Sequence, residues 1–242
     1  MEEFRKIFLY LVVLVVSVFG AQHKLPQGLT PCSRSSPDFN ECAKEEANKF
    51  LPKMVEGIKE IGLPPLNPLT VPKIDITIPG LNLVLTNAEV HGLKDTKVES
   101  CKLDFDGHIL EVMITIPFGR IVGHYSMDGE IAKIPLTGEG NCNINLTDVN
   151  LTYTLKFHTV KHDDGLEYIL IDSSDIKHNT PHVEAHLDNL PLGEAGNKLI
   201  NDNMDEIIKT MGPQVFEACQ QVINSILTTV LGHIPYDAMT TD

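Results

Sequence analysis

Three histidines, His178, His182 and His186, recur at four-residue intervals. On an α-helix this spacing would place the three imidazoles on one face, where they could share a metal ion such as zinc. Pro181 and the alternating pattern of residues 183–187 favour an extended strand instead, in which a four-residue step spans about 13 Å. That separation is too long for shared coordination, so we predict no metal site and no cofactor.

Residue patterns typical of enzymes are scarce in this sequence. It contains no Gly-x-Ser-x-Gly elbow, no His-Glu-x-x-His motif, no phosphate-binding glycine loop and no Cys-x-x-Cys pair. Ser174 and Lys177 match the Ser-x-x-Lys spacing of some acyl-transfer enzymes, but the companion motifs are missing. We therefore predict a protein that is not an enzyme. A dispersed catalytic site, as in an esterase or isomerase, is the alternative that a motif search leaves open.

The first residues predict export from the cell. Two basic residues precede an apolar run over residues 7–18, and small residues before position 21 fit a cleavage after Gly20. A membrane span needs about 20 apolar residues, whereas a signal-peptide core needs about 7–15. We predict a signal peptide over residues 1–20, a single domain over 21–242, and a secreted protein in the extracellular fluid. A short membrane anchor is the alternative.

The charge balance limits the partners of the chain. Its formal net charge is −14 at pH 7. Such a surface repels nucleic acid and anionic membranes and favours solubility. We expect no nucleic acid partner, no stable membrane insertion and a monomer.

Five cysteines in an exported chain are candidates for disulfides. Cys32 and Cys42 flank a loop rich in Ser and Pro, and we predict a bridge between them that contributes about 2.8 kcal/mol. On their strands, Cys101 and Cys142 lie on the same side as the neighbouring apolar residues. On the last helix, Cys219 lies on the apolar face, so all three should point inward. In a simple meander Cys101 and Cys142 lie about four strands apart, or ~19 Å, and a bond needs Cα atoms within ~7 Å. We expect three buried, reduced thiols, with a bridge through Cys219 as the alternative.

Apolar periodicity predicts where helices and strands lie. Residues 40–61 carry apolar side chains at three- and four-residue steps, which indicates a short helix that Pro52 kinks. From about residue 71 to residue 187 the period is two, and Asp-Gly pairs at 106–107 and 128–129 predict hairpin turns in an antiparallel meander. Apolar positions change from even to odd near Thr147 and Asp148, where an inserted residue, a β-bulge, would keep both sets on one face.

The last predicted element is a long helix over residues 193–231. Its apolar positions keep a helical period, and an unbroken helix of this length would reach ~58 Å at ~1.5 Å per residue. Gly212 and Pro213 predict a kink, because proline donates no backbone hydrogen bond and crowds the preceding turn. A sustained apolar helix face needs an equally long apolar partner, and the inner face of the meander is the candidate.

Three blocks of this sequence resemble the takeout and juvenile-hormone-binding proteins of insects. They are residues 123–129 (GHYSMDG) with 134–140 (IPLTGEG), residues 186–190 (HLDNL) with 199–203 (LINDN), and the cysteine pair before an Ala-, Glu- and Lys-rich helix. The resemblance implies an α+β fold, in which a strongly curved antiparallel sheet wraps around one long C-terminal helix, with a short N-terminal helix. It also implies transport of a small hydrophobic ligand, such as a terpenoid hormone, a fatty acid or a similar lipid, in an internal apolar tunnel.

The resemblance does not identify juvenile hormone as the ligand. Residues 190–194 lack the aromatic side chain common there in the family, and the three remaining cysteines do not reproduce a second disulfide. Ligand lining is expected where the apolar strand set faces the apolar helix set, with ordinary core as the alternative. These residues are Leu103, Phe105, Leu110, Val112, Ile114, Ile116, Met204, Ile208, Met211, Val215, Cys219 and Val222.

Two sequons follow each other in the strand region, at Asn145 and Asn150. Along a strand, odd and even positions point to opposite sides, and each asparagine alternates with the apolar residues next to it. We therefore expect both side chains to point outward, as glycosylation sites. Besides a carrier, an extracellular interaction module or a membrane-lipid-binding module of the same fold stays open. A carrier co-purifies with an apolar molecule, an enzyme turns one over, and an interaction module does neither alone.

Overall fold

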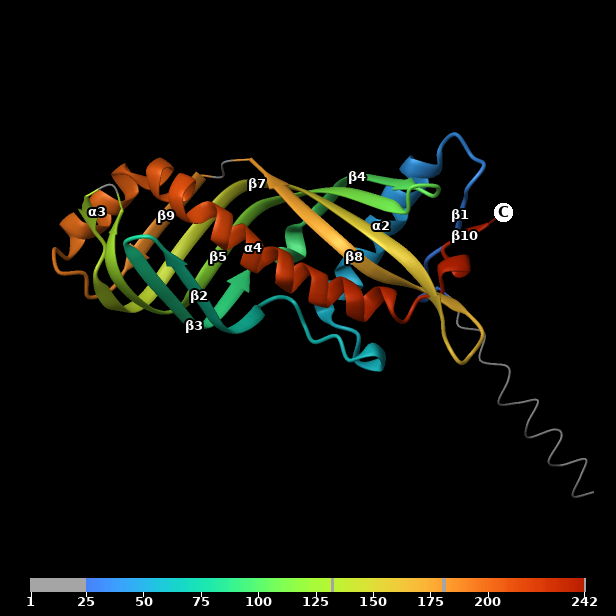
Figure 1. Cartoon of the computed structure of the whole chain (residues 1–242), viewed down its shortest axis with the longest axis horizontal. Helices are drawn as coiled ribbons and strands as arrows, with labels where there is room; N and C mark the ends of the chain where they lie inside the picture. The colour runs from blue at the N-terminus through green and yellow to red at the C-terminus, as the bar shows by residue number, and fades with distance from the viewer. Residues whose placement is uncertain (1–24, 132, 180–181, 242) are drawn as a thin grey trace, which may run out of the picture.

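The computed structural model describes residues 25–131, 133–179 and 182–241. In Figure 1 the molecule is elongated, and one long helix runs along one face of a large sheet. The helices are α2 (Phe39–Glu56), α3 (Glu194–Asp202) and α4 (Met204–Leu231), with the short 3-10 turns η1 (Lys59–Ile61), η2 (Leu93–Asp95) and η3 (Tyr236–Ala238). The strands are β1 (Cys32–Ser33), β2 (Leu69–Ile78), β3 (Leu81–His91), β4 (Lys97–Asp104), β5 (Ile109–Ile131), β6 (Ile134–Pro135), β7 (Gly138–Lys161), β8 (Glu167–His178), β9 (His182–Leu187) and β10 (Thr240–Thr241). The predicted signal peptide lies outside the described residues.

Two very long strands, β5 and β7, form the centre of the sheet. They pair antiparallel from Ile109 opposite Lys156 to Met127 opposite Gly138. The outer edge of β5 is shared by β4 at one end and β3 at the other, and β2 pairs with β3. The outer edge of β7 is likewise shared by β8 and β9. The sheet is antiparallel, as predicted, but it is not a simple meander, because each central strand holds two neighbours on one edge.

Both central strands change the parity of their inward side chains at the same level. In one half Leu110 and Leu155 face each other and pack in a cluster with helix α4. In the other half the odd positions of β5, such as Tyr125, pack against α4. Between the halves Pro117 stands opposite Asp148, whose φ is +55°. The parity change near Asp148 is confirmed, but the inserted residue is not, because the register of β5 with β7 is the same on both sides.

The C-terminal helix is interrupted at a place other than the predicted one. A single residue, Asn203, separates α3 from α4, and α4 continues through Gly212 and Pro213. Helix α4 is therefore not divided at Pro213, and the kink predicted there stays a prediction. The Pro213 side chain is exposed. The break at Asn203 arises because side chains of α3 are bound to β9, as shown below, while α4 turns along the sheet.

One of the two predicted Asp-Gly hairpins is confirmed. Asp106 and Gly107 lie in the tight connection between β4 and β5. Asp128 and Gly129 do not form a turn, because β5 continues to Ile131. Gly129 has a φ of +141°, and a Cβ atom there would lie 2.0 Å from the Gly80 carbonyl oxygen. Gly129 is needed because two strands approach each other closely at this position. The local sequence does not distinguish this requirement from that of a turn.

The N-terminal segment is attached to both the helix and the C-terminus. Helix α2 ends at Glu56, earlier than the predicted residue 61, and η1 follows after a short gap. The predicted disulfide joins Cys32 to Cys42, with Cα atoms 6.0 Å apart. Strand β1 pairs in parallel with β10, Cys32 lying opposite Thr240. The bridge therefore holds α2, the first strand and the last strand together at one end of the molecule.

We expect Gly129→Ala to destabilise the protein by about 3 kcal/mol, because the added methyl group meets backbone atoms that cannot move independently. Gly165→Ala is the matched control, since Gly165 also has a positive φ, +84°, but a Cβ atom there would meet nothing within 4 Å. The control should cost about 1 kcal/mol. Urea unfolding measures both, and equal losses would contradict the close approach at Gly129.

Candidate ligand-binding site

The two predicted sets of lining residues face each other across the interior. Val112, on β5, lies opposite Tyr153 on β7 and Cys101 on β4, and these side chains share the parity that faces α4. The helix set follows the inward stripe of α4, in which positions three and four residues apart lie one above another. Met204 and Val215 from that stripe pack against buried sheet residues.

Three apolar clusters close the two ends of the molecule. The α3 cluster fills the end around α3 and β9, the α2 cluster lies between α2 and the end of α4, and the β8 cluster joins β7, β8 and η3. The α3 cluster is Ile76, Ile78, Leu81, Leu85, Tyr125, Met127, Leu136, Cys142, Ala185, Leu187, Leu190, Ile200, Ile207 and Met211. The α2 cluster is Phe50, Leu63, Leu66, Val230 and Ile234, and the β8 cluster is Tyr153, Leu155, Phe157, Ile169 and Tyr236.

The middle of the molecule is packed less completely than its ends. Val112, Ile114 and Ile116 on the concave face stay partly exposed and belong to none of the three clusters. On the facing stripe of α4, Cys219 and Val222 also belong to none of them. These five residues form the central apolar face.

The Cys219 side chain, on the α4 part of this face, differs from the other two free thiols. Its side chain is exposed, although we predicted three buried thiols, and that part of the prediction is wrong. At the same time, burial raises the pKa of the Cys219 thiol. The Cys219 side chain is therefore accessible although protein atoms surround much of it.

The other two thiols are buried and free, as predicted. Burial raises the pKa of Cys101 to about 11 and also raises the pKa of Cys142. Their strands, β4 and β7, pair with the two edges of β5 and so lie two strands apart, not the predicted four. The two residues are separated along β5 instead, since Cys101 lies opposite Val112 and Cys142 opposite Gly123.

The remaining predicted lining residues belong to the closed ends. Leu103, Phe105 and Leu110 pack against the β8 cluster, and the ring of Phe105 lies 5.0 Å from that of Phe39 in α2. Met211 is part of the α3 cluster. Three buried residues near the central apolar face were not predicted as lining. They are Val98, Val149 and Leu151, and the strand alternation that identified Ile114 also places Val98 and Leu151 opposite it.

Two open depressions lie between described residues. One, of about 450 Å³, lies over polar side chains of β3, β5 and β7, including Arg120, His124 and Asn143. The other, of about 360 Å³, lies at the break between α3 and α4 and includes Met204 and Ile208 from the predicted set. A continuous tunnel stays a prediction.

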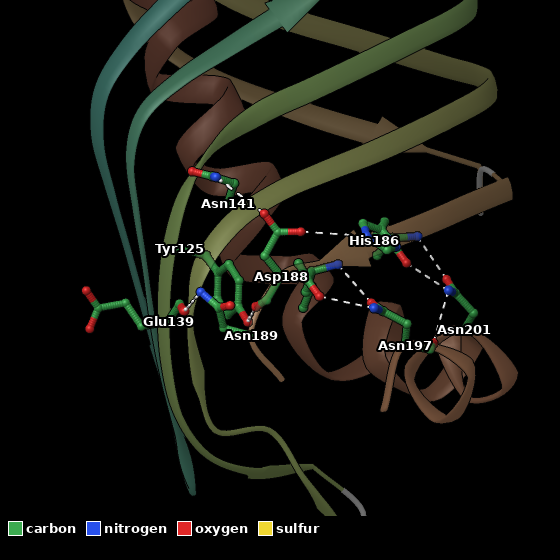
Figure 2. A network of polar contacts seen from close by, with 10 residues as sticks. Tyr125, Glu139, Asn141, His186, Asp188, Asn189, Asn197 and Asn201 are labelled. Atoms are coloured by element: carbon green, nitrogen blue, oxygen red, sulfur yellow. Dashed lines mark hydrogen bonds and ion pairs between the residues drawn. The ribbon is translucent and has the colours of Figure 1, made fainter. Parts of the chain in front are cut away.

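The first family block closes the α3 end by polar contacts, which Figure 2 shows. The Tyr125 hydroxyl donates a hydrogen bond to the Asp188 carbonyl oxygen at 2.6 Å, and burial raises the pKa of this tyrosine. The Asn189 amide donates to the Glu139 carbonyl oxygen at 3.2 Å. A Cβ atom at Gly140 would lie 2.8 Å from the Asp188 carbonyl oxygen. The block therefore serves a close contact between β5, β7 and the segment after β9.

Asn201 of the second block and Asn197, just before it, fix α3 against the backbone of β9. Asn197, which is 6% exposed, accepts a hydrogen bond from the Leu187 N–H at 2.8 Å and donates to the Leu187 carbonyl oxygen at 3.0 Å. Asn201 forms the same pair of bonds with Ala185, both at 2.8 Å (Figure 2). The side-chain amides of these two asparagines thus satisfy backbone N–H and carbonyl groups of β9 in the way that a neighbouring strand would. They explain both the position of α3 and the break that follows it.

Two residues that the sequence offered for metal binding or acyl transfer, His178 and Ser174, contact side chains of α4. No group of three His, Cys, Asp or Glu side chains in the described part of the chain is placed to hold a metal ion. His178 stacks on Phe216 of α4, with ring centroids 3.4 Å apart. The Ser174 hydroxyl donates to Asn224 at 3.0 Å and accepts from Gln220 at 2.8 Å, which ties β8 to α4. No helix among the described residues is apolar and long enough to cross a bilayer.

The two sequon asparagines lie on the outer face of β7. Asn150 is exposed, and Asn145 is partly exposed. Their neighbours Ile144 and Leu151 have the inward parity, since Ile144 packs against the α3 cluster and Leu151 is buried. The orientation agrees with the prediction, and glycan attachment stays a prediction.

Comparison with known proteins identifies the family. The family model described as "Haemolymph juvenile hormone binding protein (JHBP)" matches residues 9–241. The chain belongs to the haemolymph juvenile hormone binding protein family. Among relatives of this JHBP family chain, the circadian clock-controlled protein daywake of Drosophila yakuba is 24% identical over 226 residues, covering 86% of each chain. A putative beta-carotene-binding protein of Schistocerca gregaria is 23% identical over 219 residues, covering 88% of each.

A solved structure confirms the fold of the JHBP family chain. Takeout 1 of Epiphyas postvittana matches with a TM-score of 0.80 and 20% identity, over 88% of this chain and all of that one. The predicted fold class is thereby confirmed: a curved antiparallel sheet with a long C-terminal helix and one N-terminal helix. The family is described by hormone binding, and the relative from Schistocerca gregaria is named as a putative binding protein.

We expect Asn197→Ala to destabilise the JHBP family chain by about 2–4 kcal/mol, because it leaves the Leu187 N–H and carbonyl groups buried without partners. Asn141→Ala is the control, since Asn141 is exposed and makes one 3.3 Å bond to Asp188. The control should change stability by about 0.5 kcal/mol or less. Thermal unfolding followed by circular dichroism compares them, and a small effect at Asn197 would argue against its bracing role.

Proposed function

We propose that this protein is a secreted carrier that holds one small hydrophobic ligand at the central apolar face, between its sheet residues and its α4 residues. The carrier binds the ligand without turning it over. Terpenoid hormones, fatty acids and similar lipids have the size and chemistry that such a space accepts. The family membership supports lipophile binding, and the relative named for beta-carotene supports a nonpolar ligand.

The single observation that carries the proposal is the state of Cys219. Its side chain is exposed while burial raises the pKa of its thiol, and this combination supports an open space beside it that protein surrounds. Val112, Ile114 and Ile116 face the same region and are not fully buried. Side chains that line an open apolar space lack van der Waals contacts on one side. Each missing contact lowers the free energy of unfolding. An apolar ligand regains those contacts, which favours its binding over that of water.

The closed ends define how a ligand would lie. The α3 cluster and the α2 and β8 clusters fill the two ends of the molecule. The ligand would therefore lie along α4 in the middle, with its long axis parallel to the helix. Met204 and Met211 near one end have flexible side chains that adapt to ligands of different shape.

Several features support an extracellular setting. The predicted signal peptide over residues 1–20 and the disulfide between Cys32 and Cys42 both fit an oxidising compartment. The outward sequons at Asn145 and Asn150 fit a glycoprotein. The charge of −14 favours a soluble monomer that transports its ligand through aqueous fluid.

We expect Cys219→Trp to weaken binding of an uncharged fluorescent lipophile, because the indole ring fills the space that the ligand needs. A rise of about tenfold in Kd corresponds to about 1.4 kcal/mol. Gln221→Trp is the matched control, since Gln221 is exposed on another face of α4 and borders no ligand. Fluorescence titration measures both variants, and circular dichroism verifies that both are folded.

Two results would contradict the carrier proposal. One is the absence of saturable lipophile binding by the wild-type protein. The other is equal binding by wild type and Cys219→Trp, which would place the ligand elsewhere. Extraction of secreted protein into organic solvent, followed by mass spectrometry, identifies the ligand that accompanies it.

A further inference from the structure

The sequon asparagine Asn145 lies beside the polar depression on the outer face of the sheet. The depression has a volume of about 450 Å³, and Arg120, His124 and Asn143 are among the residues that border it. Asn145 follows Asn143 by two residues, so it lies on the same side of β7, about 7 Å further along the strand. In the register of the sheet Asn145 stands directly opposite Arg120. A group attached to Asn145 would therefore begin at the edge of the depression.

The backbone shapes this depression. The pairing of β3 with β5 shifts between Thr86 and Glu89, and Asn87, which lies in that bulge, has a φ of +50°. Gly123 and the buried Cys142 stand opposite each other in β5 and β7 and also border the depression. Their strand positions face the interior, so they present backbone to the outer face. The depression is thus a feature of the fold and does not depend only on the rotamers of exposed side chains.

Its border offers hydrogen-bonding groups to a polar partner. Arg120 Nε donates to Asn143 Oδ1 at 2.9 Å, and within the described part of the chain the guanidinium group forms no other hydrogen bond or ion pair. His124 Nε2 lies 3.4 Å from a carboxylate oxygen of Glu139, and Asn87 adds an amide. Sugar hydroxyl groups both donate and accept hydrogen bonds, so they can pair with guanidinium, imidazole and amide groups alike.

An exposed aromatic ring lies on the other side of Asn145. Phe118 is 48% exposed and stands opposite Thr147, the hydroxyl residue of the same sequon. Phe118 is a diagonal neighbour of Asn145 on the facing strand, a separation that an aromatic side chain can span. Its ring offers an apolar surface to the C–H face of a pyranose ring. Phe118 and Arg120 therefore flank the place that a sugar on Asn145 would occupy.

The side chain of the second sequon asparagine is already used within the fold. Asn150 Oδ1 accepts a hydrogen bond from the Thr115 hydroxyl at 2.8 Å, and Asn150 Nδ2 donates to the Asp148 carbonyl oxygen at 3.2 Å. The Asn145 side chain forms no hydrogen bond with the residues that the structure describes. Its amide nitrogen can therefore carry a sugar without the loss of a contact.

We propose that Asn145 carries an N-linked glycan whose first sugars lie against the outer face of the sheet. The first sugar contacts Phe118 and Arg120, and the next lies over the depression. Attachment joins Asn145 Nδ2 to the anomeric carbon of N-acetylglucosamine. The nitrogen loses one proton, and the lipid diphosphate of a lipid-linked oligosaccharide donor is the leaving group. The proposal rests on the secretion that is part of the proposed function and is independent of the ligand.

Glycan release from native protein tests the contact with Arg120. Protein secreted by a eukaryotic cell line is treated with peptide N-glycosidase, which converts each released asparagine to aspartate, and peptide mass spectrometry follows Asn145. The enzyme acts on glycan that has left the protein surface, so its rate follows the unbound fraction. Arg120→Ala should raise that rate about fivefold, the effect of one lost hydrogen bond. Lys156→Ala, an equal loss of charge at an exposed position of β7, is the control and should leave the rate unchanged.

A second pair of variants tests the aromatic contact. Phe118→Ser should raise the release rate at Asn145 about threefold, because the sugar loses its apolar neighbour. Met113→Ser is the matched control, since Met113 is 39% exposed on the same strand but lies further from Asn145. Circular dichroism verifies that all four variants are folded.

The outcomes distinguish the glycan from the carrier function. Secreted protein in which Asn145 is unmodified overturns the glycan proposal and leaves the carrier proposal standing. A release rate that Arg120→Ala leaves unchanged, or that Lys156→Ala raises equally, overturns the contact with the sheet. Protein that is retained inside the cell overturns both the glycan and the secretion of the carrier. Failure of lipophile binding by the same secreted sample counts against the carrier alone.

Discussion

The pairing of β5 with β7 is the interaction on which the rest of the structure depends. The two strands stay in one register from Ile109 and Lys156 to Met127 and Gly138, and every other major strand attaches to them or to their neighbours. Both strands reverse their inward parity at the level of Pro117 and Asp148. Only because they reverse together can one continuous face meet α4 along its whole length. The helix, the end clusters and the central apolar face all follow from that shared face.

Local chemistry made part of this architecture predictable. The amphipathic period of the last helix, the Asp106–Gly107 turn and the Cys32–Cys42 bridge depend on residues close in sequence, and all three are confirmed. The helix break at Asn203 depends on hydrogen bonds from α3 to β9, which only the folded chain brings together. The position of Gly129 inside strand β5 likewise depends on its close approach to Gly80, which is far from it in sequence.

The sequence predicts which side chains of the candidate site face inward. It does not predict whether those side chains fill the interior. Alternation on β5 and helical spacing on α4 identify Val112, Ile114, Cys219 and Val222 as residues that face inward. The same signal includes Phe105, which belongs to a packed end, because periodicity reports direction and not packing density. The asparagines and glycines of the family blocks proved to be bracing elements, so the resemblance rests largely on residues that close the α3 end.

Alkylation of Cys219 by N-ethylmaleimide tests the central claim most directly, because this thiol borders the proposed ligand space. The reaction is run at mildly alkaline pH, since burial raises the pKa of the thiol and only the thiolate reacts. Peptide mass spectrometry follows the modification of native protein with and without a saturating uncharged lipophile. We expect the ligand to slow alkylation of Cys219, while the buried Cys101 and Cys142 stay unmodified in both conditions. Alkylation of Cys219 at the same rate while the lipophile remains bound would contradict it.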